Sequence, residues 1–126
     1  MGQHEHKRVL RRGARFWNQW RLENPEVIPE LSFCVIEGSD LSGADLSGAD
    51  LYCAWLQGVN LSGADLSGAD LNGAGLAGAD VTNTDLSGAL NLTQAQVNEA
   101  QGSEDTKLPE GLRRPEHWGV TQTVGQ

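Results

Sequence analysis

The chain has 126 residues, enough for one domain, with a formal net charge of −8 and 38% hydrophobic residues. No apolar run approaches the roughly 18 residues of a membrane-spanning helix, and the basic N-terminus lacks the apolar core of a secretory signal. Two cysteines are too few for a disulfide scaffold, so we expect a cytoplasmic protein.

The charge is divided into blocks along the chain. Residues 1–22 carry a net charge of +5, residues 23–105 carry −14 without a lysine or arginine, and residues 106–126 carry +1. Nucleic-acid-binding proteins present a basic patch or stripe to the phosphates. We therefore expect no direct binding to nucleic acid.

Residues 1–28 form a basic N-terminal segment that predicts one amphipathic helix over residues 7–22. Its basic face carries Arg8, Arg11, Arg12 and Arg15, and its other face carries Val9, Gly13, Phe16 and Trp20 with Trp17 beside them. We expect this helix to cap the segment that follows. A basic amphipathic helix is also typical of attachment to an anionic membrane, although the acidic remainder of the chain argues against it. His4 and His6 are expected in a frayed terminus rather than at a metal site.

Residues 29–90 repeat with a period of five. Twelve units in succession have an apolar centre and, in most units, an acidic residue one position earlier; a small residue stands two positions earlier in all but the first unit, which has Pro29. Glycine follows two positions later in nine of the twelve. A period of five fits neither the 3,4 spacing of a helix nor the alternation of a strand. It indicates a short extended piece followed by a turn, wound into a coil with the centres inside. The centres are Leu31, Ile36, Leu41, Leu46, Leu51, Leu56, Leu61, Leu66, Leu71, Leu76, Val81 and Leu86.

This repeat resembles that of the pentapeptide-repeat proteins, whose pattern is small–Asp/Asn–Leu–x–x. The resemblance implies an all-β solenoid, a right-handed quadrilateral β-helix with four units per coil, and hence about three coils. The flanks also resemble those of small bacterial members. The similar stretches are residues 16–21, 24–26 and 107–112, with Pro115, His117 and Trp118.

Residues 91–126 predict a capping helix and a tail. Thr93 is a favourable N-cap with Gln96 three positions later, which predicts a helix over residues 94–101 that ends at Gly102. Val97 is expected to pack on the last coil. The apolar anchors of the tail are expected to be Leu108, Leu112 and Trp118.

Four units per coil would stack residues that lie twenty positions apart, which sorts the outward side chains into four faces. Three faces would carry acidic ladders, which we interpret mainly as hydrogen-bond acceptors at turns, with an acidic recognition surface as the alternative and metal binding as a minor one. The ladders comprise Asp40 and Asp80 with Asn60 between them; Asp45, Asp65 and Asp85; and Glu30, Asp50 and Asp70.

The fourth face would be apolar, with Val35, Trp55 and Gly75 in the stack, and Glu37, Gln57 and Ala77 flanking it. Gly75 is expected to leave room for the Trp55 ring. We define the candidate interaction patch as Phe33, Val35, Tyr52 and Trp55, with Cys53 on the same edge. Either the chain's own N-terminal helix or tail covers this patch, or a partner or second copy does.

No catalytic constellation is recognisable, and we expect no enzymatic activity, cofactor or metal site. Cys34 should point inward and Cys53 outward, so no disulfide is expected between them. We expect a noncatalytic scaffold or protein–protein interaction module whose partner the sequence does not identify; a homodimer is one alternative.

Some longer pentapeptide-repeat proteins mimic DNA and protect gyrase, so the resemblance offers a DNA-mimicking, gyrase-interacting protein as an alternative function. Three coils would span only about 15 Å, less than half of the roughly 34 Å of one duplex turn.

Overall fold

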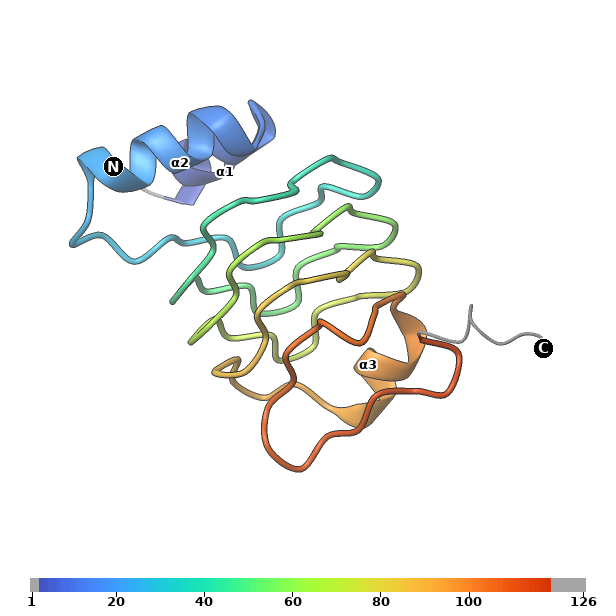
Figure 1. The fold of residues 1–126 in the computed structure, drawn as a ribbon. Helices are drawn as coiled ribbons and strands as arrows, with labels where there is room; N and C mark the ends of the chain where they lie inside the picture. The colour runs from blue at the N-terminus through green and yellow to red at the C-terminus, as the bar shows by residue number, and fades with distance from the viewer. Residues whose placement is uncertain (1–2, 119–126) are drawn as a thin grey trace.

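The computed structural model describes residues 3–118 and places helices at both ends of a stack of coils (Figure 1). Helices α1 (Gln3–Arg11) and α2 (Ala14–Glu23) lie at the N-terminal end, and α3 (Gln94–Glu99) lies at the C-terminal end. The C-terminal tail was predicted to run to residue 126, and its last part, residues 119–126, lies outside the described residues.

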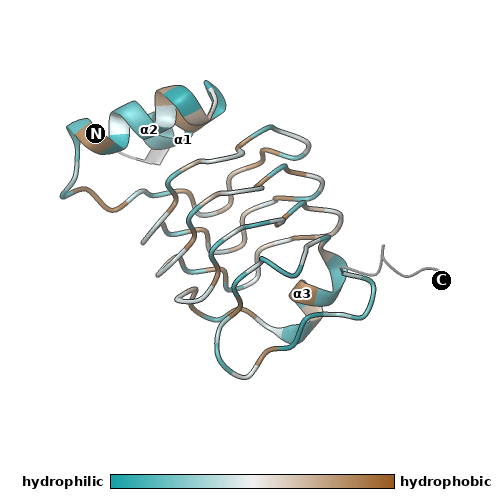
Figure 2. Ribbon diagram, viewed as in Figure 1, coloured by the Kyte–Doolittle hydropathy of each residue, from teal (hydrophilic) through white to brown (hydrophobic). Residues whose placement is uncertain are grey.

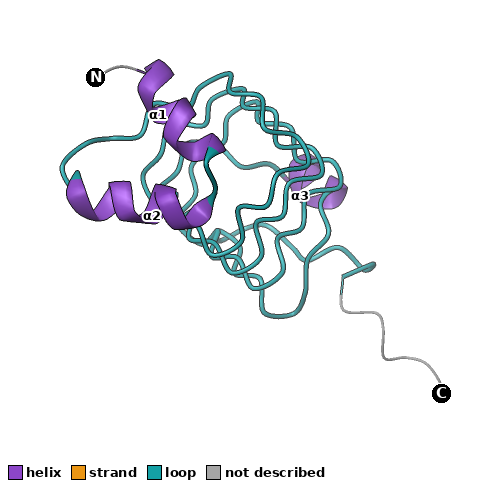
Figure 3. Cartoon of the chain, turned by 90° about the horizontal axis from the view of Figure 1, so that it is seen from above, coloured by secondary structure: helices purple, strands orange, loops and turns teal. Residues whose placement is uncertain are grey.

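Each coil takes twenty residues, as the period of five predicts for a four-sided tube. Parallel bridges join residues that lie twenty positions apart, from Glu30–Asp50 and Val35–Trp55 to Asp65–Asp85. Each contact is a single-residue bridge, because most of every five-residue unit is used to turn the corner. Helices and turns therefore account for the regular structure of residues 3–118, and Figure 3 shows no strand among them.

Backbone hydrogen bonds hold the coils in register. The N–H of Leu46 donates to the carbonyl of Asp65 at 2.8 Å, and the N–H of Asp65 donates to the carbonyl of Ala44 at 3.0 Å. Within a unit, the N–H of Ala49 donates to the carbonyl of Leu46 at 3.1 Å and closes the turn. This arrangement repeats along the stack, so backbone groups that the tube buries are paired without an extended sheet.

The core is a column of the predicted centres and small residues. All twelve centres are buried, and the small residues from Cys34 to Ala89 are buried beside them except Ser39, which is partly exposed. Figure 2 shows the resulting alternation of apolar and hydrophilic segments along each coil. Thr84 is the polar member of this column, and its hydroxyl donates to the carbonyl of Leu61 at 2.6 Å, which satisfies the buried group.

The prediction of one continuous helix over residues 7–22 is wrong, because the chain breaks at Gly13. Gly13 has φ +104°, a conformation that glycine adopts without steric cost, and α1 and α2 are packed against each other. The break changes which side chains face inward. Leu10, Trp17 and Trp20 are buried, whereas Phe16, which was predicted on the inner face, is 49% exposed.

The four predicted basic residues therefore do not form one face of one helix. Arg8 and Arg11 belong to α1 and Arg15 to α2, while Arg12 lies in the connection; all four are exposed. Arg8 pairs with Glu5 at 3.0 Å. These cations are thus spread over two short helices.

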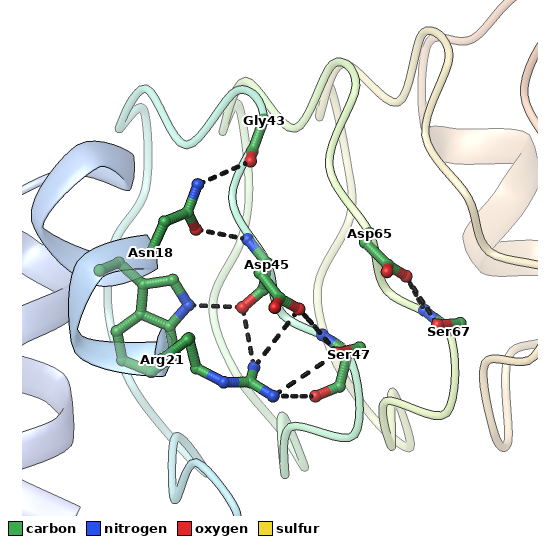
Figure 4. A network of polar contacts seen from close by, with 8 residues as sticks. Asn18, Arg21, Gly43, Asp45, Ser47, Asp65 and Ser67 are labelled. Carbon is green, nitrogen blue, oxygen red and sulfur yellow. Dashed lines mark hydrogen bonds and ion pairs between the residues drawn. The ribbon is translucent and has the colours of Figure 1, made fainter. Parts of the chain in front are cut away.

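Side chains of α2 replace the coil that would precede the first one. The amide of Asn18 donates to the carbonyl of Gly43 at 3.0 Å and accepts the N–H of Asp45 at 2.7 Å (Figure 4). Trp17 Nε1 and Arg21 Nη1 both donate to the carbonyl of Asp45. The end of the tube is therefore capped by polar groups as well as by apolar burial.

His6 does not lie in a frayed terminus, contrary to the prediction. Its ring is 2% exposed and stacks at an angle on Trp20, with 4.8 Å between the ring centroids. Its Nδ1 accepts the N–H of Glu30 at 2.8 Å, a backbone donor that has no preceding coil to pair with. Burial lowers the pKa of His6, so the neutral ring is favoured, as this hydrogen bond requires.

At the other end α3 has the predicted N-terminus. Thr93 and Gln96 form a reciprocal capping box, and Val97 is buried, as expected. The helix ends at Glu99 rather than at residue 101. Gln96 also donates to the carbonyls of Leu71 and Ala74, which closes part of the last coil.

After α3 the chain adds one irregular layer to two faces of the tube. Gln101 bridges to Asp80 and Lys107 bridges to Asp85, each in the parallel sense of the repeats. Trp118 is buried, and its Nε1 donates to the carbonyl of Ala100 at 2.9 Å. The predicted anchors Leu108 and Leu112 pack against the core with partial exposure. The tail therefore covers the open end in a layer that lacks the five-residue period.

Replacing Asn18 by alanine should lower the free energy of unfolding by about 1–2 kcal/mol, because the N–H of Asp45 and the carbonyl of Gly43 lose their partner. Urea denaturation measures the change. Gln19→Ala is the matched control, because the Gln19 amide bonds only to the exposed Glu23 on the same helix. Equal effects of the two substitutions would contradict the capping role.

Stability should fall between pH 7.5 and 5.5 because of His6. Its folded pKa lies below the ordinary value of 6.5, so the stability it contributes is present above 6.5 and is lost as pH falls through that value. Glu30 and Glu5 oppose the shift and limit its size. Urea denaturation at both pH values should show a smaller pH effect in His6→Ala. The exposed His4→Ala control should retain the wild-type difference, and equal pH effects in all three proteins would rule this explanation out.

Candidate interaction surface

The candidate interaction patch is exposed on one side of the tube. Phe33 is 58% exposed, Val35 53%, Tyr52 41% and Trp55 51%. The rings of Phe33 and Tyr52 meet edge to face with 5.5 Å between their centroids, and Val35 and Trp55 are bridged neighbours in adjacent coils. The structure thus brings together the four residues that the repeat geometry selected.

Within residues 3–118, neither terminal segment buries this patch. The polar contacts of α2 go to Gly43, Asp45 and Ser47, which belong to the opposite side of the four-sided tube. The alternative that the chain's own described segments cover the aromatic side chains is therefore wrong. Residues 119–126 lie outside the described part of the chain.

A hollow of about 440 Å³ opens beside the aromatic rings. It is lined by Phe33, Cys53, Ala54, Trp55, Gln57, Gly73 and Gly75. The expectation that Gly75 leaves room for the Trp55 ring stays a prediction; the structure shows that a Cβ at Gly75 would overlap the amide of Gln57. The sequence pattern gave no signal for this, since Gln57 occupies a variable position of the repeat. The Gln57 Oε1 is buried and has no hydrogen-bond partner among the described residues.

Two residues of this region hold a conformation that normally belongs to glycine. Phe33 has φ +62° and Cys53 has φ +54°, at the repeat position where Gly43 and Gly48 have φ near +70°. A residue with a Cβ costs roughly 1–2 kcal/mol in this left-handed region. Such strain is concentrated at functional sites.

The acidic ladders carry a regular hydrogen-bond motif. Asp85 Oδ1 accepts the N–H of Ser87 at 3.0 Å and its hydroxyl at 2.6 Å, and these bonds hold the pKa of Asp85 below its ordinary value of 3.8. Asp40 is held low in the same way by Ser42. Asn60 makes the same pair of contacts with Ser62, so the motif needs an oxygen acceptor but not a charge. The main interpretation of these residues as turn acceptors is therefore supported.

The two cysteines lie as predicted, with Cys34 buried, Cys53 partly exposed and both thiols free. Burial raises the pKa of Cys34, which keeps it protonated. A side-chain hydrogen bond with Cys53 is the main cause of a raised pKa in Tyr52, and the charge of Asp70 adds to it. Tyr52 thus presents a neutral phenol at the surface.

The side chains that could bind a metal ion do not cluster in the described part of the chain. In the described residues no group of three His, Cys, Asp or Glu side chains could hold a metal ion. His117 lies in the tail, with Nε2 3.1 Å from the carbonyl of Ala100. No helix in residues 3–118 is long and apolar enough to cross a membrane.

Comparison with known proteins agrees with the repeat geometry. The profile described as pentapeptide repeats matches residues 30–63, 56–88 and 64–101, with eight copies. The chain belongs to the pentapeptide-repeat family. Members of this family form a right-handed β-helix, and the twenty-residue coils are of this kind.

A solved structure with similar sequence is a pentapeptide repeat protein from Nostoc PCC 7120. It is 36% identical over 69% of this chain and 75% of its own, with a TM-score of 0.29. The family assignment rests on the match of the repeats to the family profile. No curated protein matches the chain.

Replacing Cys53 by glycine should raise the free energy of unfolding by about 0.5–1 kcal/mol, because it relieves the left-handed strain at φ +54°. Thermal or urea denaturation measures the gain. Asn83→Gly is the control: Asn83 has φ +57°, but asparagine tolerates this region, so its change should be smaller. A loss of stability in Cys53→Gly would show that the thiol's packing on Gly73 outweighs the strain.

Proposed function

We propose that this protein is a noncatalytic protein-interaction module whose contact surface is the candidate interaction patch. The observation that carries the proposal is where the repeat departs from its pattern. The position before the centre is Asp, Glu or Asn in nine of twelve units, and the three exceptions are Val35, Trp55 and Gly75. All three stack on one face of the tube.

Stabilisation of the tube does not explain why these three positions differ from the usual repeat residues. Phe33 and Cys53 hold strained turns beside the same face, and Phe33, Val35 and Trp55 expose apolar area that an acidic residue or glycine would not. Aromatic residues supply much of the binding energy in protein interfaces. A contact with another protein explains both the strain and the exposure.

The chemistry of the described side chains supports a noncatalytic role. Each aspartate of the ladders accepts the backbone N–H two residues later, so these carboxylates serve the turns. His6 accepts a backbone N–H at the N-terminal cap, and Cys34 is buried. None of these groups is placed beside a nucleophile or an open acid–base pair of the kind that catalysis needs.

The patch also favours protein binding over imitation of DNA. A duplex presents negative charge around its whole circumference, whereas one side of this tube carries the uncharged stack of Val35, Trp55 and Gly75. A gyrase-supercoiling assay that compares the wild-type protein with Trp55→Asp separates the alternatives. Inhibition or protection that both proteins show would favour DNA imitation by the acidic ladders.

Affinity capture from a lysate of the organism that encodes the chain tests the proposal. Trp55→Asp restores the residue type that the repeat uses elsewhere and should abolish recovery of the partner while leaving the fold intact. Leu22→Asp is the matched control, because Leu22 is 77% exposed on α2, away from the patch, and should leave recovery unchanged. A partner recovered equally by all three proteins, or by none, would contradict a role for this patch.

A further inference from the structure

We propose that the segment bound by the patch presents one aromatic or long aliphatic anchor residue flanked by lysines or arginines. This inference deepens the proposed function and rests on it. It follows from three features of the described residues: the charge that borders the patch, the hollow beside it, and the unpartnered amide oxygen of Gln57, which lines the hollow.

The patch lies between two acidic ladders. Glu30, Asp50 and Asp70 stack on one side, and Asp40, Asn60 and Asp80 stack on the other. The nearer ladder touches the patch, because Asp50 Oδ1 accepts the N–H of Tyr52 at 3.1 Å. With no lysine or arginine anywhere in residues 23–105, these carboxylates are not neutralised by basic side chains of the coils. A partner with cations on both sides of its anchor would match this border.

The N-terminal end of the patch has a different charge. Arg11 of α1 lines a second hollow together with Val35, Ile36, Glu37 and Ser39. The cations of the partner should therefore lie over the carboxylates of the second and third coils, Asp50 and Asp70 on one side of the patch and Asp80 on the other, away from Arg11. This fixes a direction in which a basic segment would cross the face.

The hollow beside Trp55 can adapt to an anchor because Gln57, one of its lining side chains, is weakly held. Gln57 lies over Gly75 with a buried, unpartnered amide oxygen, an arrangement that costs free energy relative to hydration of that oxygen. Moving the Gln57 side chain outward would return its amide to water and uncover the space above Gly75. An apolar anchor could then pack between Phe33 and Trp55.

The same charges disfavour the other occupants. A second copy bound patch to patch would bring Asp50 and Asp70 of both copies together, and like charges at an interface are strongly unfavourable. A nucleic acid or an anionic membrane would meet the same repulsion. A second copy, a nucleic acid and an anionic membrane would each bring negative charge to the patch, whereas a basic segment would bring positive charge.

Selection from a displayed library of random twelve-residue peptides tests the inference. Wild-type protein is the target, and Trp55→Asp serves for counter-selection. The enriched peptides should share an aromatic or long aliphatic residue with at least two lysines or arginines around it. A synthesised peptide from the enriched set should then bind more weakly as salt is raised, because screening acts on exposed charges.

Charge-only variants identify the carboxylates involved. Asp70→Asn keeps the turn acceptor, as Asn60 does, and should weaken binding of that peptide about three- to tenfold. Asp65→Asn is the matched control: like Asp70, Asp65 accepts the backbone N–H two residues later through Oδ1, but it lies on the side of the tube opposite the patch, so its substitution should leave binding unchanged. Phe33→Gly relieves a strained turn, so a more stable variant that binds less well would separate recognition from folding.

The outcomes separate this inference from the proposed function. Neutral or acidic peptides that need Trp55 would overturn the partner chemistry while leaving the interaction surface in place. Cationic peptides that bind Trp55→Asp equally well would show attraction to the ladders alone and overturn it too. If no peptide is enriched, the inference fails, and the capture experiment decides separately whether the patch binds a protein.

Discussion

Everything in this molecule depends on one register: residues twenty positions apart lie on top of each other at the spacing of paired strands, about 4.8 Å. That register puts each leucine centre above another and buries the column without an extended sheet. It also fixes the surface, because a residue before a centre always points out of the same side as its neighbours in the coils above and below. The residue types at a few stacked positions therefore determine the character of a whole face. The apolar face results from three such positions, Val35, Trp55 and Gly75.

The coils were predictable from the sequence because their period is strict. Twelve centres in succession predict a coil with the centres inside, and the four units per coil that the resemblance to pentapeptide-repeat proteins implies place Val35 and Trp55 on one face. The turn positions were equally readable, since glycine recurs there. The patch residues could be selected from the sequence for the same reason: they differ from the residue types that the five-residue repeat has at the corresponding positions of most other units.

The ends were less predictable because they follow no period. A hydrophobic pattern through residues 7–22 suggested one helix, but the backbone freedom of Gly13 and the burial available to Leu10 favoured two. Whether His6 would be free or buried depended on an unpaired N–H of Glu30, which is defined only once the first coil exists. The position of Gln57 likewise depends on the empty space above Gly75, which is a tertiary property.

The two caps have separate chemistries and touch the tube only at its first and last layers. His6 and Asn18 pair with backbone groups of the opening coil, and Gln96 pairs with carbonyls of the closing one. Insertion or deletion of twenty residues would therefore change the number of coils while both caps keep their contacts. Insertion or deletion of five residues would instead move every later residue to the neighbouring face of the tube. A change in length by twenty residues after the patch would alter the distance between the candidate interaction patch and α3 without changing the residues of the patch.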